Sequence, residues 1–168
     1  MTVQLTADQV WEVLDKELFA VLGMVTPAGE ARTVGIVYVT RDRRLYISSG
    51  TDTWKVKHIR KNPHVSLTVP VHKGIPLMPW IKIPAATITF CGSAVILDPR
   101  ETPTEIVRAI YRDMANNEQL MAESCLIEVT PLGEFLTYGI GIPMMKMRDP
   151  EQARGRAPVG VESGLQTA

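Results

Sequence analysis

The residues best suited to chemistry lie in "SGTDTWKVKHIRKNP", residues 49–63, where hydroxyl side chains precede a basic segment. The run "RLYISSG" before it ends in hydroxyls, and Thr51, Asp52 or Thr53 can cap a helix over 53–61. The first backbone N–H groups of a helix lack partners and carry partial positive charge. Lys55 falls in that first turn, so its ammonium can point at the same place. The pattern predicts a local phosphate site made by Ser48, Ser49, the free N–H groups and Lys55.

A second interpretation of the same segment stays open. Its basic side chains can form a solvated helix face, with Val56 and Ile59 packed inward. The basic residues concerned are Lys55, Lys57, Arg60 and Lys61.

Composition limits the classes of protein to consider. The 168 residues suit one domain, and 18 Lys+Arg balance 18 Asp+Glu, so we expect no general nucleic-acid binding and any anion site must be local. No apolar run approaches the roughly 20 residues of a membrane span, and no cleavable signal pattern is visible, so a cytoplasmic protein is expected. Cys91 and Cys125 have no metal-ligand spacing, so we predict no metal site and two buried, reduced thiols.

The periodic segments predict a mainly β protein. Helices are expected over 7–17, with a Thr6–Gln9 capping box, over 53–61, and from Thr102-Pro103 onward. The stripe from Ile106 to Met114 on this last helix is expected to be core. Strands are expected in a meander from residue 18, over 64–69 and 85–97, and in "CLIEVTP" and "EFLTYGI". Six or seven strands joined by short turns favour an antiparallel β-barrel with flanking helices.

Two segments fall outside this pattern. Residues 71–84 form a long connection with Pro76, Pro79 and Trp80, expected either to serve function or to fold onto the core. Residues 143–168 are rich in Arg, Gly and Pro, and we expect an extended, partly disordered arm after a barrel domain at 1–142.

Three stretches together resemble a known family. "RTVGIVYV", "LYISSG" and "WKVKHIRKNPHVSLTV" are similar in order and spacing to the flavin-binding split barrels related to pyridoxamine 5′-phosphate oxidase, and the resemblance extends over residues 10–142. It implies a Greek-key split barrel, FMN as cofactor, and a homodimer with FMN in the interface.

The resemblance also implies roles for individual residues. Arg32 matches the arginine that begins the flavin-contacting strand, Lys55 matches the phosphate-binding lysine, and Thr87 falls near a residue that the neighbouring subunit contributes. Trp54 can pack against the flavin edge or the partner chain, or it can be an ordinary core or interface tryptophan. The full set of predicted cofactor residues is Arg32, Val34, Gly35, Ile36, Ile47, Ser48, Ser49, Trp54, Lys55 and Thr87.

The same requirements follow from the chemistry of FMN, which needs an anion site, hydroxyls beside its ribityl chain and a flat apolar slot. Gly35 in "VGIV" lets a backbone approach the ring edge. Some positions depart from the family pattern. Trp54 stands where the oxidase carries an arginine, Val37 stands where it has a lysine, and "EFLTYGIGIPMMKMRDP" lacks the Arg-x-His element for pyridoxal phosphate. Vitamin B6 oxidation is therefore not expected.

The leading hypothesis is an FMN-dependent oxidoreductase acting on an unidentified small molecule, with the chemistry in the cofactor and no catalytic residue assigned. The loop at 71–84, or the partner's arm with Met144, Met145 and Met147, would form its roof. Two alternatives remain. The first is a reductase that uses the deazaflavin F420, whose longer acidic tail would bind Lys57, Arg60 and Lys61. The second is a non-catalytic protein that binds flavin or haem. Haem would need an axial ligand from His58, His64 or His72.

Overall fold

A computed structural model describes residues 3–71, 85–143, 146–147 and 149–160. Part of the sequence-based predictions therefore lies outside the described residues. This part comprises the predicted loop after Val71, which contains His72 and Trp80, and the residues Met144 and Met145. The helices are α1 (Ala7–Leu14), α2 (Trp54–Lys61), α3 (Thr104–Tyr111), α4 (Glu118–Glu123) and α5 (Pro150–Ala153), with 3-10 turns at Pro99–Glu101 and Arg112–Asn116. The strands are β1 (Val3–Gln4), β2 (Phe19–Val25), β3 (Ala31–Val37), β4 (Val39–Arg41), β5 (Arg44–Gly50), β6 (His64–Val71), β7 (Ala86–Leu97), β8 (Ser124–Tyr138) and β9 (Arg154–Pro158).

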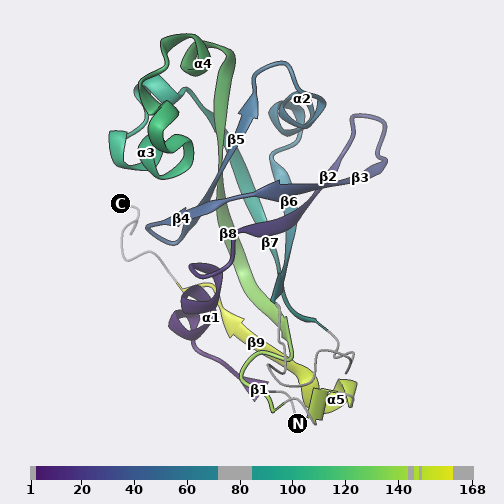
Figure 1. The fold of residues 1–168 in the computed structure, drawn as a ribbon. Helices are drawn as coiled ribbons and strands as arrows, with labels where there is room; N and C mark the ends of the chain where they lie inside the picture. The colour runs from purple at the N-terminus through teal and green to yellow at the C-terminus, as the bar shows by residue number, and fades with distance from the viewer. Residues whose placement is uncertain (1–2, 72–84, 144–145, 148, 161–168) are drawn as a thin grey trace, which may run out of the picture.

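All described strands belong to one sheet. Its main path runs β1-β9-β8-β7-β6-β2-β3, and β5 pairs with both β4 and β8. Every pairing is antiparallel except that of β1 with β9. In Figure 1, β2 and β3 cross β7 and β8, whereas β6 runs alongside β7, its antiparallel partner; α3 and α4 lie at one end and α1 near the other. This confirms the predicted fold class, a mostly β protein with flanking helices.

The sheet has nine strands within the described residues, against the six or seven expected. The surplus comes from short strands such as β1, β4 and β9, which are too brief for an alternating pattern to mark them. Residues 154–158, inside the expected arm, pair with β8 from Glu134 to Tyr138 and so form part of the sheet.

Alternating side chains on the strands build the main core, and Trp11 of α1 reaches it with its ring 5.7 Å from that of Phe135. The Thr6–Gln9 capping box that begins α1 is confirmed, with Thr6 N donating to Gln9 Oε1 at 2.9 Å. A second cluster packs α3 and α4 on β5 and β8; it consists of Tyr46, Ile106, Val107, Tyr111, Met121 and Leu126.

Several sequence-based expectations are wrong in detail. Thr102 does not cap α3, because its hydroxyl donates to the carbonyl of Asp98 at 2.8 Å and the helix begins at Thr104. The two strands predicted at the end of the barrel are one, β8, which runs through Pro131 and Gly133.

Exposure also differs from expectation at two positions. Cys91 is exposed because it faces outward on β7 between the buried Phe90 and Gly92, whereas Cys125 is buried. Met114 is 58% exposed rather than core, since α3 ends before it. None of the described helices is long and apolar enough to cross a membrane.

Candidate functional site

A cavity of about 310 Å³ opens between the end of β3, the middle of β5 and the start of α2. We call it the Lys55 cavity. Its volume falls at the lower end of the range for small-molecule sites, about 300–1,000 Å³. It is lined by Gly35, Ile36, Val37, Tyr38, Val39, Tyr46, Ile47, Ser48, Lys55 and Ile110.

Half of the predicted cofactor residues meet in this cavity. They are Gly35, Ile36, Ile47, Ser48 and Lys55, drawn from three elements. β5 pairs with β8 and not with β3, so the cavity lies where β3, β4 and β5 come together without a complete hydrogen-bonded ladder. Helix α2 follows β5 after a short turn, which explains why Lys55 lies beside Ser48.

Lys55, at the start of α2, differs in exposure from the other basic residues of its segment. Lys55 is half-buried and lines the cavity, whereas Lys57 and Lys61 are exposed. Val56 and Ile59 pack inward, as the solvated-face interpretation required. Thr53, the N-cap residue, makes no side-chain hydrogen bond to the helix. The helix is therefore amphipathic, as the solvated-face interpretation predicts, and one of its lysines lines a cavity; the phosphate site stays a prediction.

Ser49 lies apart from the cavity. Ser48 lines the cavity, whereas the next residue, Ser49, does not line it and is only 6% exposed. Its hydroxyl oxygen lies 2.9 Å from that of Thr53. Ser49 thus supports the turn before α2 and does not line the cavity.

Arg32 and Trp54 line a separate cavity of about 380 Å³ with Thr33 and His58. Arg32 pairs with the Glu30 carboxylate at 3.0 Å, and both side chains are more than half exposed. The rings of Trp54 and His58 lie 5.6 Å apart, edge to face.

The two remaining predicted residues lie elsewhere in the sheet. Val34 packs at the edge of the main core. Thr87 lies in the middle of the sheet, opposite Pro70 on β6 and Tyr138 on β8. Neither residue lines the Lys55 cavity, so the contribution of Thr87 from a neighbouring subunit stays a prediction.

Gly35 allows a close approach, but from within the chain. A Cβ at this position would lie 2.9 Å from Cε2 of Phe19, whose ring therefore covers the glycine. Phe19 is 46% exposed, and it is flanked by Leu18 and Val37, which are 58% and 67% exposed. We call Leu18, Phe19 and Val37 the β2–β3 patch.

Sequence reasoning missed four lining residues, Tyr38, Val39, Tyr46 and Ile110. Ile110 belongs to the apolar stripe of α3, which was expected to be core. Tyr46 donates a hydrogen bond to Oε2 of Glu128 at 2.8 Å. Burial first, and then Glu128, raises the pKa of Tyr46 to about 12.

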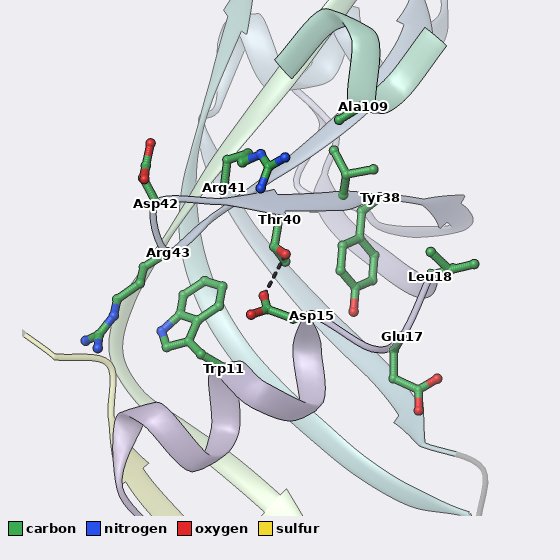
Figure 2. A pocket seen from close by; sticks show the side chains of 11 residues that line it. Trp11, Asp15, Glu17, Leu18, Tyr38, Thr40, Arg41, Asp42, Arg43 and Ala109 are labelled. Atoms are coloured by element: carbon green, nitrogen blue, oxygen red, sulfur yellow. Dashed lines mark hydrogen bonds between the residues drawn. The ribbon is translucent and has the colours of Figure 1, made fainter. Parts of the chain in front are cut away.

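A second cavity, of about 590 Å³, adjoins the first, and we call it the Arg41 cavity (Figure 2). Asp15 accepts a hydrogen bond from the Thr40 hydroxyl at 2.6 Å. The Tyr38 hydroxyl donates to the carbonyl of Leu14 at 2.9 Å, and its pKa is raised by burial and by the nearby carboxylates of Glu17 and Asp15. The lining residues are Trp11, Asp15, Glu17, Leu18, Tyr38, Val39, Thr40, Arg41, Asp42, Arg43 and Ala109.

Comparisons with known proteins identify the fold. The model of a family described as pyridoxamine 5′-phosphate oxidase matches residues 6–137. Curated protein sequences gave no significant match. Three solved structures with low identity share the fold. An F420 reductase is 20% identical with a TM-score of 0.52, covering 74% of this chain and 93% of its own. An FAD-binding protein from Mesorhizobium loti is 17% identical with a TM-score of 0.56, covering 76% and 88%. HutZ, the heme storage protein from Vibrio cholerae, is 13% identical with a TM-score of 0.62, covering 80% and 95%.

Proposed function

Because the chain belongs to the pyridoxamine 5′-phosphate oxidase family, we propose that it binds FMN in the Lys55 cavity and acts as an FMN-dependent oxidoreductase on a small molecule. The observation that carries the proposal is the meeting of Gly35, Ile36, Ile47, Ser48 and Lys55 in one cavity. The sequence resemblance assigns the same five residues to FMN.

The groups in and around the cavity fit the three parts of FMN. The Lys55 ammonium, beside the start of α2, suits the phosphate. The Ser48 hydroxyl suits the ribityl chain. Ile36 and Ile47 offer an apolar wall for the ring. Gly35 lies opposite Val21 at a non-hydrogen-bonded position of the β2–β3 ladder, so its backbone N–H and C=O can face the pyrimidine edge. When bound, the flavin would supply hydride transfer, and these residues would bind and orient it.

The proposal includes a homodimer. The β2–β3 patch leaves three large apolar side chains exposed beside the Lys55 cavity, where a second subunit can cover them. Thr87 would then come from the partner. At Val37, which is 67% exposed, the chain offers an apolar side chain to a substrate where the oxidase has a lysine, so the proposed substrate is not a vitamin B6 phosphate.

One alternative cofactor has support from a specific observation. Lys57, Arg60 and Lys61 are exposed on α2 beyond the Lys55 cavity, which suits the long acidic tail of F420. The haem alternative has less support. His58 lies half-buried next to Trp54, and His64 is exposed, so neither lines the Lys55 cavity.

A visible absorption spectrum of the purified protein tests the proposal. We expect paired flavin bands, or quenching of FMN fluorescence when FMN is titrated into colourless protein. Titrations with F420 and haemin run beside it as controls. Saturable binding of F420 or haemin, with no binding of FMN, would overturn the FMN assignment.

A further inference from the structure

We propose that the Arg41 cavity binds the substrate, a small amphoteric molecule whose acidic group pairs with Arg41 and whose amino group pairs with Asp15. This inference rests on the proposed function, since it makes the Lys55 cavity the cofactor site and the Arg41 cavity its neighbour. No comparison assigns a ligand to the Arg41 cavity.

The two cavities adjoin along a shared wall. Tyr38 and Val39, at the junction of β3 and β4, line both. Helix α3 supplies Ala109 to the Arg41 cavity and the next residue, Ile110, to the Lys55 cavity. A molecule in the Arg41 cavity would therefore lie next to a ring held in the Lys55 cavity.

Two opposite charges stand in the Arg41 cavity with no charge to neutralise them. Neither Arg41 nor Asp15 forms a salt bridge within the part of the chain that the structure describes. In Figure 2 Arg41 lies on one face of β4, and Thr40 and Asp15 lie on the other, where the Thr40 hydroxyl holds the Asp15 carboxylate. That hydrogen bond fixes one charged group in place before a ligand arrives, which reduces the entropy lost on binding. A ligand that meets both charges would therefore reach across β4.

The other charged side chains that line the cavity point away from its centre, and one of them already forms a salt bridge. Arg43 points away from the cavity centre and pairs with Asp8. The side chains of Asp42 and Glu17 also point outward in Figure 2. The Arg41–Asp15 pair is therefore what a ligand in this cavity would meet.

The turn that carries Arg41 is held in an uncommon conformation. Asp42 and Arg43 both have positive φ, 47° and 56°, in the two-residue turn between β4 and β5. A two-residue hairpin turn requires positive φ at both central residues, because that matches the twist of the flanking strands. The tight turn fixes where the strand ends and so fixes the backbone that carries Arg41.

The chemistry of the lining defines the ligand. A guanidinium binds a carboxylate through two parallel hydrogen bonds, and a carboxylate such as Asp15 binds an ammonium or amino group. Trp11, Leu18 and Val39 also line the cavity and provide apolar surface for a flat or aliphatic body. Amino acids with an apolar body have this pattern, so 4-aminobenzoate is a suitable probe.

The experiment titrates FMN-loaded protein with 4-aminobenzoate, benzoate and aniline, following the flavin absorption bands. We expect 4-aminobenzoate to bind about tenfold more tightly than either partial probe. Arg41→Gln should weaken 4-aminobenzoate and benzoate about tenfold and leave aniline unchanged. Asp15→Asn should weaken 4-aminobenzoate and aniline but leave benzoate unchanged. Arg43→Gln, on the adjacent residue, is the matched control and should change none of the three.

Arg41→Lys keeps the positive charge but loses the planar guanidinium that makes two parallel hydrogen bonds. Its affinity for 4-aminobenzoate should therefore fall between those of the wild type and Arg41→Gln. Equal affinities for the three probes, or equal losses in Arg41→Gln and Arg43→Gln, would overturn the proposal. If the protein takes up no FMN, the proposed cofactor fails separately. The same titrations, read by calorimetry on the protein without flavin, then decide whether the Arg41 cavity binds the probes.

Discussion

The Lys55 cavity and the Arg41 cavity share a wall but are built differently. The Lys55 cavity takes most of its lining from three stretches of chain, 35–39, 46–48 and Lys55, and contains one charged side chain. The Arg41 cavity is lined by five charged residues, drawn from the chain after α1 and from the β4–β5 hairpin. The two cavities therefore differ chiefly in how many charged side chains line them.

The difference indicates two kinds of recognition. A cofactor with a fixed shape can be bound by local sequence, because a strand end and a helix start already provide backbone groups and partial charge. A substrate is distinguished by where its charges are, and such a charge pattern needs side chains from distant parts of the chain. We expect the Lys55 cavity to determine FMN affinity and the Arg41 cavity to determine substrate choice.

Lys55→Ala has the largest expected effect on this comparison. Removing a charge-assisted contact to the phosphate should weaken FMN binding about 10- to 100-fold. Lys57→Ala, on the exposed side of α2, is the matched control and should change FMN affinity little. Fluorescence titration with FMN measures both. If Lys55→Ala changed the affinity by less than about twofold, or if Arg41→Ala weakened FMN more, the phosphate would not be bound at Lys55.

Trp54→Arg should have a smaller effect in the opposite direction. Trp54 is 45% exposed, so replacing it costs little packing. The arginine would restore the charge that the family resemblance expects at this position, and we expect FMN to bind about three- to tenfold more tightly at low salt. The gain should shrink as ionic strength rises. Trp54→Gln, which adds no charge, should show no gain; an equal gain there would exclude an electrostatic cause.

The two tyrosines of the cavities should give the smallest effect, in the pH dependence of stability. Folding raises the pKa of Tyr46 to about 12, chiefly through burial. Because the neutral phenol is the form favoured in the fold, this contribution to stability is complete below pH 10 and is lost as the pH rises toward 12. The melting temperature of the wild type should therefore fall between pH 9.5 and pH 11.5, and that of Tyr46→Phe should fall by roughly 2 °C less.

Tyr38 sharpens the comparison of the two cavities. Burial and the carboxylates of Glu17 and Asp15 raise its pKa further. In an ultraviolet titration of phenolate, the signal lost in Tyr46→Phe should therefore appear at lower pH than the signal lost in Tyr38→Phe. The reverse order would contradict the closeness of Glu17 and Asp15 to the Tyr38 hydroxyl.

Much of the fold could be predicted because its signals are local. The Thr6–Gln9 capping box, the helix before Asn62-Pro63 and the alternation over residues 86–97 each depend on neighbours in sequence. β1 and β9 could not be predicted, since two to five residues show no periodicity and their partners lie at the other end of the chain.

The candidate site divides in the same way. Gly35, Ser48 and Lys55 were predicted because their elements follow one another along the chain. Ile110 was missed because an apolar residue on an amphipathic helix looks the same whether it faces a core or a cavity. Ser49 does not line the Lys55 cavity, since its hydroxyl lies against that of Thr53, and its assignment to FMN stays a prediction. That Arg41 and Asp15 line one cavity had no sequence signal, since the two residues come from separate elements.

The parallel pairing of β1 with β9 has a consequence for how the protein is made. Val3 lies opposite Gly155, and the amide of Leu5 donates to the carbonyl of Arg156 at 3.0 Å. During translation these first residues must wait until β9 has left the ribosome. Contacts between residues so distant in sequence form slowly, because a long loop must close first. Helix α1 follows directly on β1, so the side of the Arg41 cavity that Trp11 and Asp15 form is expected to assemble last. In a ribosome-bound nascent chain, the Lys55 cavity, the proposed cofactor site, would then form before the Arg41 cavity, the proposed substrate site.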